Sequence, residues 1–99
     1  MSKTPFVWEI QVRREVLDAE IARLREIPYS VWLGVITRPM VKEALGRDNR
    51  TYRVQASARM ARPGSRDIEV AIDLQSPGLR RRRMRQTFVI TPDNRFLEG

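Results

Sequence analysis

The residues of this chain whose chemistry is most evident are its arginines. Seventeen of its nineteen basic side chains are arginine, and five stand close together as an arginine run: Arg80, Arg81, Arg82, Arg83 and Arg85. No acidic residue lies between Gln75 and Gln86. Because each planar guanidinium can donate two parallel hydrogen bonds to a phosphate, the run is a candidate site for nucleic acid or another anionic surface.

Other signatures of nucleic-acid binding are missing from the sequence. No aromatic residue is interleaved with the arginine run, and neither a helix-turn-helix pattern nor the aromatic signature of an RNA-recognition sheet is present. A chain that favours arginine throughout can also carry such a run as a solvated loop. Both interpretations of the arginine run stay open: an anion-binding site, and a loop without a ligand.

Side chains for catalysis or metal binding are scarce. The chain has no histidine and no cysteine, which removes the commonest general base, the thiolate nucleophile and the usual ligands of transition metals. The serines lack a nucleophile-elbow context, and the glycines lack the spacing of a phosphate-binding loop. We therefore expect no enzyme activity, no cofactor and no metal. A carboxylate-only chemistry would have to use Glu69, Asp73 or Asp93.

Length and composition bound the architecture. Ninety-nine residues, 41% of them hydrophobic and 31% charged, suit one globular domain over residues 1–99. No apolar stretch approaches the roughly 18–20 residues of a membrane span. Glu9 interrupts the apolar residues at the N-terminus, so we expect no secretory signal and a cytoplasmic location.

The elements that position these residues begin with a predicted helix from Pro5 to Glu26. Pro28 ends it, because the residue before a proline is disfavoured in a helix. At helical spacing its apolar residues form one stripe: Phe6, Ile10, Leu17, Ile21 and Leu24. Residues 29–37 fit either a short helix or a strand. The helix, with Ser30 as its cap and Trp32 in the core, is favoured because the residues after Pro28 make a better helix start.

From Met40 onward the apolar residues alternate, which is typical of half-buried strands. The pattern predicts a weak strand over 40–45 and clear strands over 51–60, 68–74 and 84–91, with a turn at 92–95 that brings Phe96 back to the core. Because successive strands joined by short turns are usually neighbours, the sequence predicts an α+β fold. In this fold the N-terminal helix packs on a three- to four-stranded antiparallel meander sheet.

The polar side of the predicted sheet places opposite charges across one hairpin. Arg53 and Arg59 come from one strand, and the acids Asp67, Glu69 and Asp73 come from the next. Side chains that lie opposite or diagonal on one face are about 5–8 Å apart, so we expect these residues to form ion pairs, each contributing about 0–1 kcal/mol. As the alternative, Glu69 and Asp73 would form a carboxylate pair or a divalent cation site.

Four segments from residue 24 onward carry a resemblance to a known pattern. They are residues 24–30 (Leu-Arg-Glu-Ile-Pro-Tyr-Ser), 51–55, 67–73 and 88–96. On these segments the chain resembles a family of small bacterial α+β domains without an assigned activity. The resemblance implies the same architecture and supplies no catalytic residue. This chain departs from the pattern after the strand over 67–73. Residues 74–78 and then the arginine run stand where the pattern has an acidic, glycine-rich turn.

Together these observations favour a small non-enzymatic module that acts by binding. The expected partner is another protein or a second copy of the chain, docked on a free edge strand, either residues 40–45 or the terminal strand. The alternative is binding of nucleic acid or an anionic surface through the arginine run.

Overall fold

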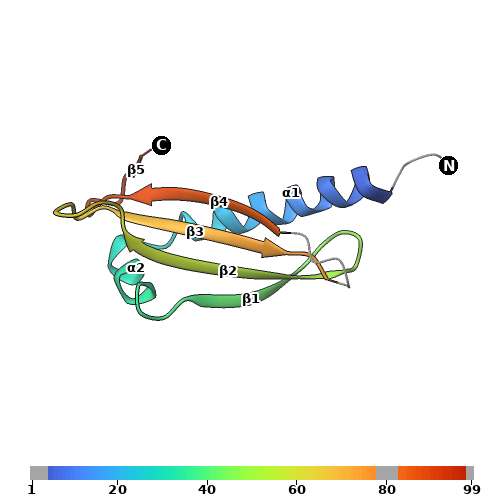
Figure 1. The fold of residues 1–99 in the computed structure, drawn as a ribbon, viewed down its shortest axis with the longest axis horizontal. Helices are drawn as coiled ribbons and strands as arrows, with labels where there is room; N and C mark the ends of the chain where they lie inside the picture. Colours follow the sequence, from blue (N-terminus) through green and yellow to red (C-terminus); the bar gives the residue numbers. More distant parts are fainter. Residues whose placement is uncertain (1–4, 78–82, 98–99) are drawn as a thin grey trace.

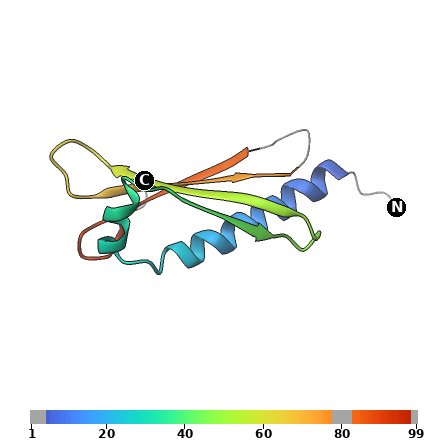
Figure 2. The same ribbon diagram turned by 90° about the horizontal axis from the view of Figure 1, so that it is seen from below.

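The computed structural model describes the backbone of residues 5–77 and 83–97 and the side chains from residue 10 onward within these ranges. The elements are α1 (Pro5–Leu24), α2 (Tyr29–Val35), β1 (Met40–Leu45), β2 (Thr51–Met60), β3 (Ile68–Gln75), β4 (Arg83–Ile90) and β5 (Phe96–Leu97). All five strands form one antiparallel sheet in the order β1-β2-β3-β4-β5 (Figure 1). Both helices lie on the same side of this sheet (Figure 2). The predicted α+β class is confirmed.

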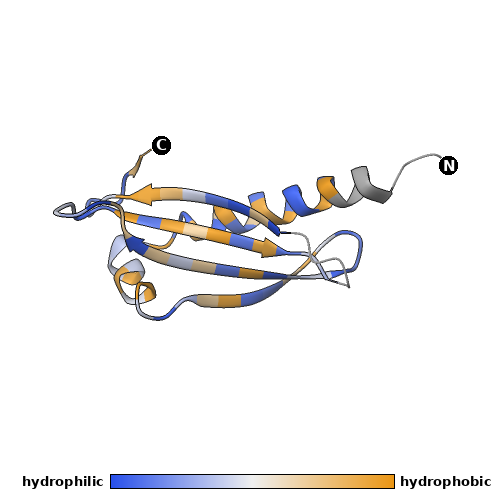
Figure 3. Cartoon of the chain, in the orientation of Figure 1, coloured by the Kyte–Doolittle hydropathy of each residue, from blue (hydrophilic) through white to orange (hydrophobic). Residues whose placement is uncertain are grey.

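Alternation along the strands separates an inner face, which packs on the helices, from an open face. The inner residues of β2 and β3 are buried: Tyr52, Val54, Ala56, Ala58, Ile68, Val70, Ile72 and Leu74. The positions between them are polar except for the buried Ala71 of β3, and the colours of Figure 3 alternate accordingly along β2. The short turns keep the strands in sequence order, so the predicted meander is confirmed, with β5 as an added strand of two residues.

Helix α1 differs from its prediction in its end and in the face it buries. It ends at Leu24 rather than Glu26. The reason is that the following amides donate to the carbonyl three residues back instead of four: Glu26 to Arg23 and Ile27 to Leu24, both at 3.1 Å. Ile10, predicted on the buried stripe, is 38% exposed. The buried face is rotated from that stripe and comprises Val12, Arg13, Val16, Leu17, Glu20, Ile21 and Leu24. Phe6 lies outside the described side chains.

Residues 29–35 form the short helix that the sequence favoured, but its cap differs. The N-cap residue is Pro28, which has no side-chain cap hydrogen bond, and Ser30 lies inside the first turn. The free amide of Tyr29 instead donates to Asn94 Oδ1 at 2.8 Å, from the turn between β4 and β5. A distant turn therefore supplies the capping group of α2.

An aromatic cluster joins α2 to β4 and β5. Trp32 is fully buried, and its ring meets Phe88 edge to face at 6.1 Å between centroids; Phe88 meets Phe96 in the same way at 5.5 Å. The Arg25 guanidinium lies 5.7 Å and 5.2 Å from the centroids of these two phenylalanine rings. The predicted core position of Trp32 and the return of Phe96 to the core are confirmed.

Among the side chains of α1 described from residue 10 onward, two charged ones are buried, and they differ in their partners. Glu20 is 3% exposed and accepts from Lys42 Nζ on β1 and from Arg23 Nη1, both at 3.2 Å. Arg13 is 5% exposed, yet its Nε and Nη1 atoms have no hydrogen-bond partner. Glu20 thus ties α1 to the edge of the sheet, whereas two donors of Arg13 are buried without a partner among the described residues.

Tyr52, near the start of β2, makes the stability of the fold depend on pH in the alkaline range. Burial of its ring, followed by its hydrogen bond to Asp48 Oδ2 at 2.7 Å, raises the pKa of Tyr52 to about 12. The folded chain therefore holds the Tyr52 proton more tightly than an unfolded chain, in which the pKa is about 10. The stabilisation that Tyr52 contributes is complete below a pH of about 10 and is lost as the pH rises to about 12.

Tyr52→Phe is therefore expected to lower stability at neutral pH by about 1 kcal/mol and to remove this part of the alkaline loss. Urea unfolding of the wild type and the variant, at one pH below about 10 and one above it, measures the difference in the free energy of unfolding. An equal alkaline loss in the two proteins would contradict the assignment to Tyr52.

Candidate functional site

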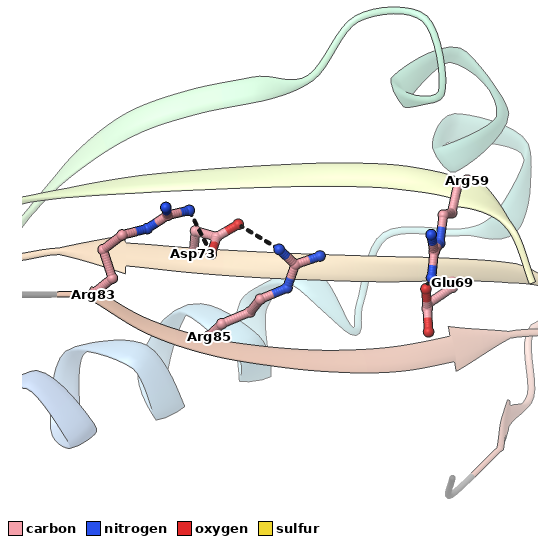
Figure 4. Close-up of polar contacts among 5 residues, drawn as sticks. All are labelled: Arg59, Glu69, Asp73, Arg83 and Arg85. Carbon is pink, nitrogen blue, oxygen red and sulfur yellow. Dashed lines mark hydrogen bonds and ion pairs between the residues drawn. The ribbon is translucent and has the colours of Figure 1, made fainter.

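The structure describes two members of the arginine run, Arg83 and Arg85, and places both on the open face of β4. They converge on Asp73 of β3: Arg83 Nη2 lies 3.3 Å from Oδ1, and Arg85 Nη1 lies 3.8 Å from Oδ2 (Figure 4). Asp73 is 18% exposed and neutralises part of this charge. Arg80, Arg81 and Arg82 lie outside the described residues.

The predicted cross-strand pairing is correct for one arginine. Arg59 Nε donates to Glu69 Oε1 at 2.6 Å, at directly opposite positions of β2 and β3 (Figure 4). Arg53, by contrast, lies opposite Gln75, and Asp73 takes its partners from β4 instead. Sequence alternation gives the face of each residue, but the register decides which charges meet.

The candidate carboxylates do not form one site. Glu69 and Asp73 are four residues apart on the same strand, which is about 13 Å; Glu69 pairs with Arg59, and Asp73 pairs with Arg83 and Arg85. Asp93 lies in the turn after β4, where the hydrogen bond from the Thr91 hydroxyl lowers the pKa of its carboxyl. Within the described residues no group of three or more acidic side chains is placed to hold a metal ion.

A polar hollow of about 310 Å³ opens on the open face beside Asp73. It is lined by Arg53, Gln55, Asp73, Gln75 and Arg83. Among the described residues Arg53 has no hydrogen bond or ion pair, so its guanidinium is free to bind an anion in this hollow. The sequence pattern placed these residues on the polar side of the sheet, but only the register shows that they share one depression.

Strand β1 forms one edge of the sheet, and its open face exposes two apolar side chains on either side of Glu43. Within residues 5–77 and 83–97 no strand pairs with it except β2. Val41 is 53% exposed and Leu45 70%, and both lie on the open face. The sequence predicted a weak strand here, and its apolar residues fall on both faces. Those on the open face give the edge an apolar surface.

An apolar hollow of about 340 Å³ adjoins this edge on the inner side, between α1 and β1. Its walls are Glu20, Leu24, Met40, Val41, Lys42, Val54 and Ala56. Helix α1 therefore leaves part of the inner face near β1 uncovered. The Lys42–Glu20 ion pair bridges the helix and the strand at this hollow.

The opposite edge of the sheet has a different character. β5 pairs only with Val89 and Ile90, so the first part of β4 has no further strand beside it among the described residues. That part carries Arg83 and Arg85, and charged side chains on an edge disfavour pairing with another strand. The β1 edge, by contrast, exposes the apolar Val41 and Leu45.

Comparison with known proteins identifies no relative: no family model matches the chain, and no curated protein or solved structure is significantly similar to it. No described helix is long and apolar enough to cross a membrane.

Proposed function

We propose that this protein is a non-enzymatic interaction module that binds a polypeptide along β1 by strand addition. The observation that carries the proposal is the β1 edge, where Val41 and Leu45 are exposed on the open face and Val41 also borders the apolar hollow. An added strand gains main-chain hydrogen bonds from such an edge and side-chain contacts from the apolar residues on it.

The two charges on β1 differ in their partners. Lys42 is held by the buried carboxylate of Glu20. Glu43 lies directly opposite Arg53 of β2 but forms no ion pair with it, so its carboxylate stays exposed between Val41 and Leu45. An incoming strand therefore meets apolar side chains on either side of one carboxylate.

Site-specific photo-crosslinking in the cells that make the protein tests this function. A photoreactive amino acid in place of Val41 is expected to capture a polypeptide, whereas the same amino acid in place of Val31 on α2 is not. The two valines are a matched pair, because their exposed fractions are 53% and 48%. Equal capture from both positions, or capture from neither, would contradict the proposal.

The second candidate function is binding of phosphate groups at the polar hollow and the adjoining arginine run. It is favoured by the unpaired Arg53, which shares the hollow with Arg83 and with the amide donors Gln55 and Gln75. Against it, Arg83 and Arg85 are partly neutralised by Asp73. The protein-interaction function therefore comes first.

Titration with single-stranded RNA, single-stranded DNA and anionic vesicles tests the second candidate. For a single strand each phosphate contact contributes about −0.7 to the slope of log affinity against log salt, so Arg53→Gln is expected to make the slope shallower by about that amount. Arg59→Gln is the matched control, since Arg59 is already bound to Glu69. Negligible binding by the wild type near physiological salt would rule this function out.

A further inference from the structure

We infer that the polypeptide that adds to β1 is a second copy of this chain, paired antiparallel through its own β1 about a two-fold axis at Glu43. This inference rests on the proposed function and names its partner. In the arrangement Val41 of each copy lies opposite Leu45 of the other, and the two sheets become continuous.

The hydrogen bonds of the β1–β2 hairpin determine which residues of β1 offer their backbone to a partner. The Gly46 amide donates to the Arg50 carbonyl at 2.9 Å, so this pair is a hydrogen-bonded one. Hydrogen-bonded pairs recur at every second residue of an antiparallel ladder, which turns the backbone groups of Lys42 and Ala44 toward β2. The amides and carbonyls of Val41, Glu43 and Leu45 therefore point away from the sheet.

Symmetry then leaves two central registers for pairing β1 with itself. Residues opposite each other must lie on the same face of the sheet, so the axis passes through Glu43 or through Lys42. An axis at Lys42 would bring two ammonium groups together and would set Val41 against Glu43. An axis at Glu43 sets the exposed Val41 against the exposed Leu45, once on each side. The apolar pairing selects the axis at Glu43.

The charges of β1 fit the same register. Lys42 keeps its ion pair with Glu20 and lies opposite the small Ala44 of the second copy. The two Glu43 carboxylates meet at the axis. On the β2 side each Glu43 lies opposite Arg53 of its own copy. The row across the interface is therefore Arg53, Glu43, Glu43, Arg53, which has no net charge. The like-charged pair weakens the association without preventing it.

Sedimentation of the full chain over a wide range of concentration tests the inference, with Val31→Lys as the control for adding a charge at an exposed valine. The wild type is expected to be in a monomer–dimer equilibrium. Val41→Lys or Leu45→Lys is expected to weaken the dimer by at least about tenfold, because each removes both apolar pairs. Glu43→Gln is expected to tighten it several-fold, a gain that misfolding does not produce.

Three results would overturn the inference. One is a wild type and a Glu43→Gln variant that both stay monomeric at every concentration. Another is a dimer that Val41→Lys and Leu45→Lys leave unchanged. The third is tightening by Lys42→Gln but not by Glu43→Gln, which indicates the other register. If the chain is monomeric but crosslinks to a different protein from Val41 alone, the second copy is excluded and the proposed function stands.

Discussion

Trp32→Ala is expected to lower the free energy of unfolding by about 3–5 kcal/mol, the largest loss among the substitutions considered. The indole is fully buried, contacts Phe88 edge to face, and donates from Nε1 to the Ile27 carbonyl at 3.2 Å. Its removal leaves a cavity between α2 and the sheet and an unsatisfied carbonyl in the link between the helices. Urea denaturation followed by circular dichroism measures the loss.

Leu33→Ala is the matched control, because Leu33 is the next residue of α2 and is 47% exposed. It is expected to change stability by less than about 0.5 kcal/mol. A loss of similar size for the two variants would contradict the placement of α2, since it would mean that the opposite face of the helix is also packed.

Arg13→Met is expected to raise stability, by about 1–3 kcal/mol. Arg13 is 5% exposed on the inner face of α1, and its Nε and Nη1 atoms find no partner there. Methionine keeps the length and apolar character of the side chain while it removes the buried charge and both unsatisfied donors. Thermal and urea unfolding of the variant and the wild type measure the change.

The neighbouring Arg14 provides the control for this substitution. Its side chain is 54% exposed and lies 3.8 Å from Asp18, so Arg14→Met is expected to leave stability within about 0.5 kcal/mol. If Arg13→Met instead destabilised the protein by several kcal/mol, the buried guanidinium would have a compensating partner, and the energetic description of α1 would be wrong.

The strands and their turns were predictable because their signals are local. Each alternation of apolar and polar residues extends over one strand, as at 51–60, and the strand boundaries that it indicates agree with the structure to within a residue. The short helix after Pro28 could be favoured for the same reason, since Pro28, Tyr29 and Ser30 make a local helix start. The capping of this helix by Asn94 could not be predicted, because Asn94 and the Tyr29 amide that it accepts from are far apart in sequence.

The face that α1 buries was less predictable because it depends on what lies against it. A stripe of apolar residues at helical spacing favoured Ile10, whereas the sheet buries Arg13 and Glu20 in its place. Glu20 is buried because β1 brings Lys42 to it, and sequence periodicity carries no information on such a partner. For Arg13 the described side chains include no partner for the Nε and Nη1 atoms.

For the candidate sites, the sequence identified the charges but not their grouping. It separated the polar face of the sheet from the apolar one and paired Arg59 with Glu69 correctly. The register, however, places Asp73 beside Arg83 and Arg85, and gathers Arg53 with two glutamines around a hollow. The edge at β1 was one of two predicted, and its exposed Val41 and Leu45 distinguish it from the charged edge at β4.

Hydrogen exchange at the backbone amides of β1 tests the central claim most directly. Isotopically labelled protein is compared when dilute and alone, when concentrated, and in unlabelled extract of the cells that make it. Strand addition predicts that Val41, Glu43 and Leu45, whose amides point outward, become slow to exchange on concentration or in extract, while Val31 is unchanged. Amides at these three positions that exchange as fast in every sample as in the dilute protein would contradict it.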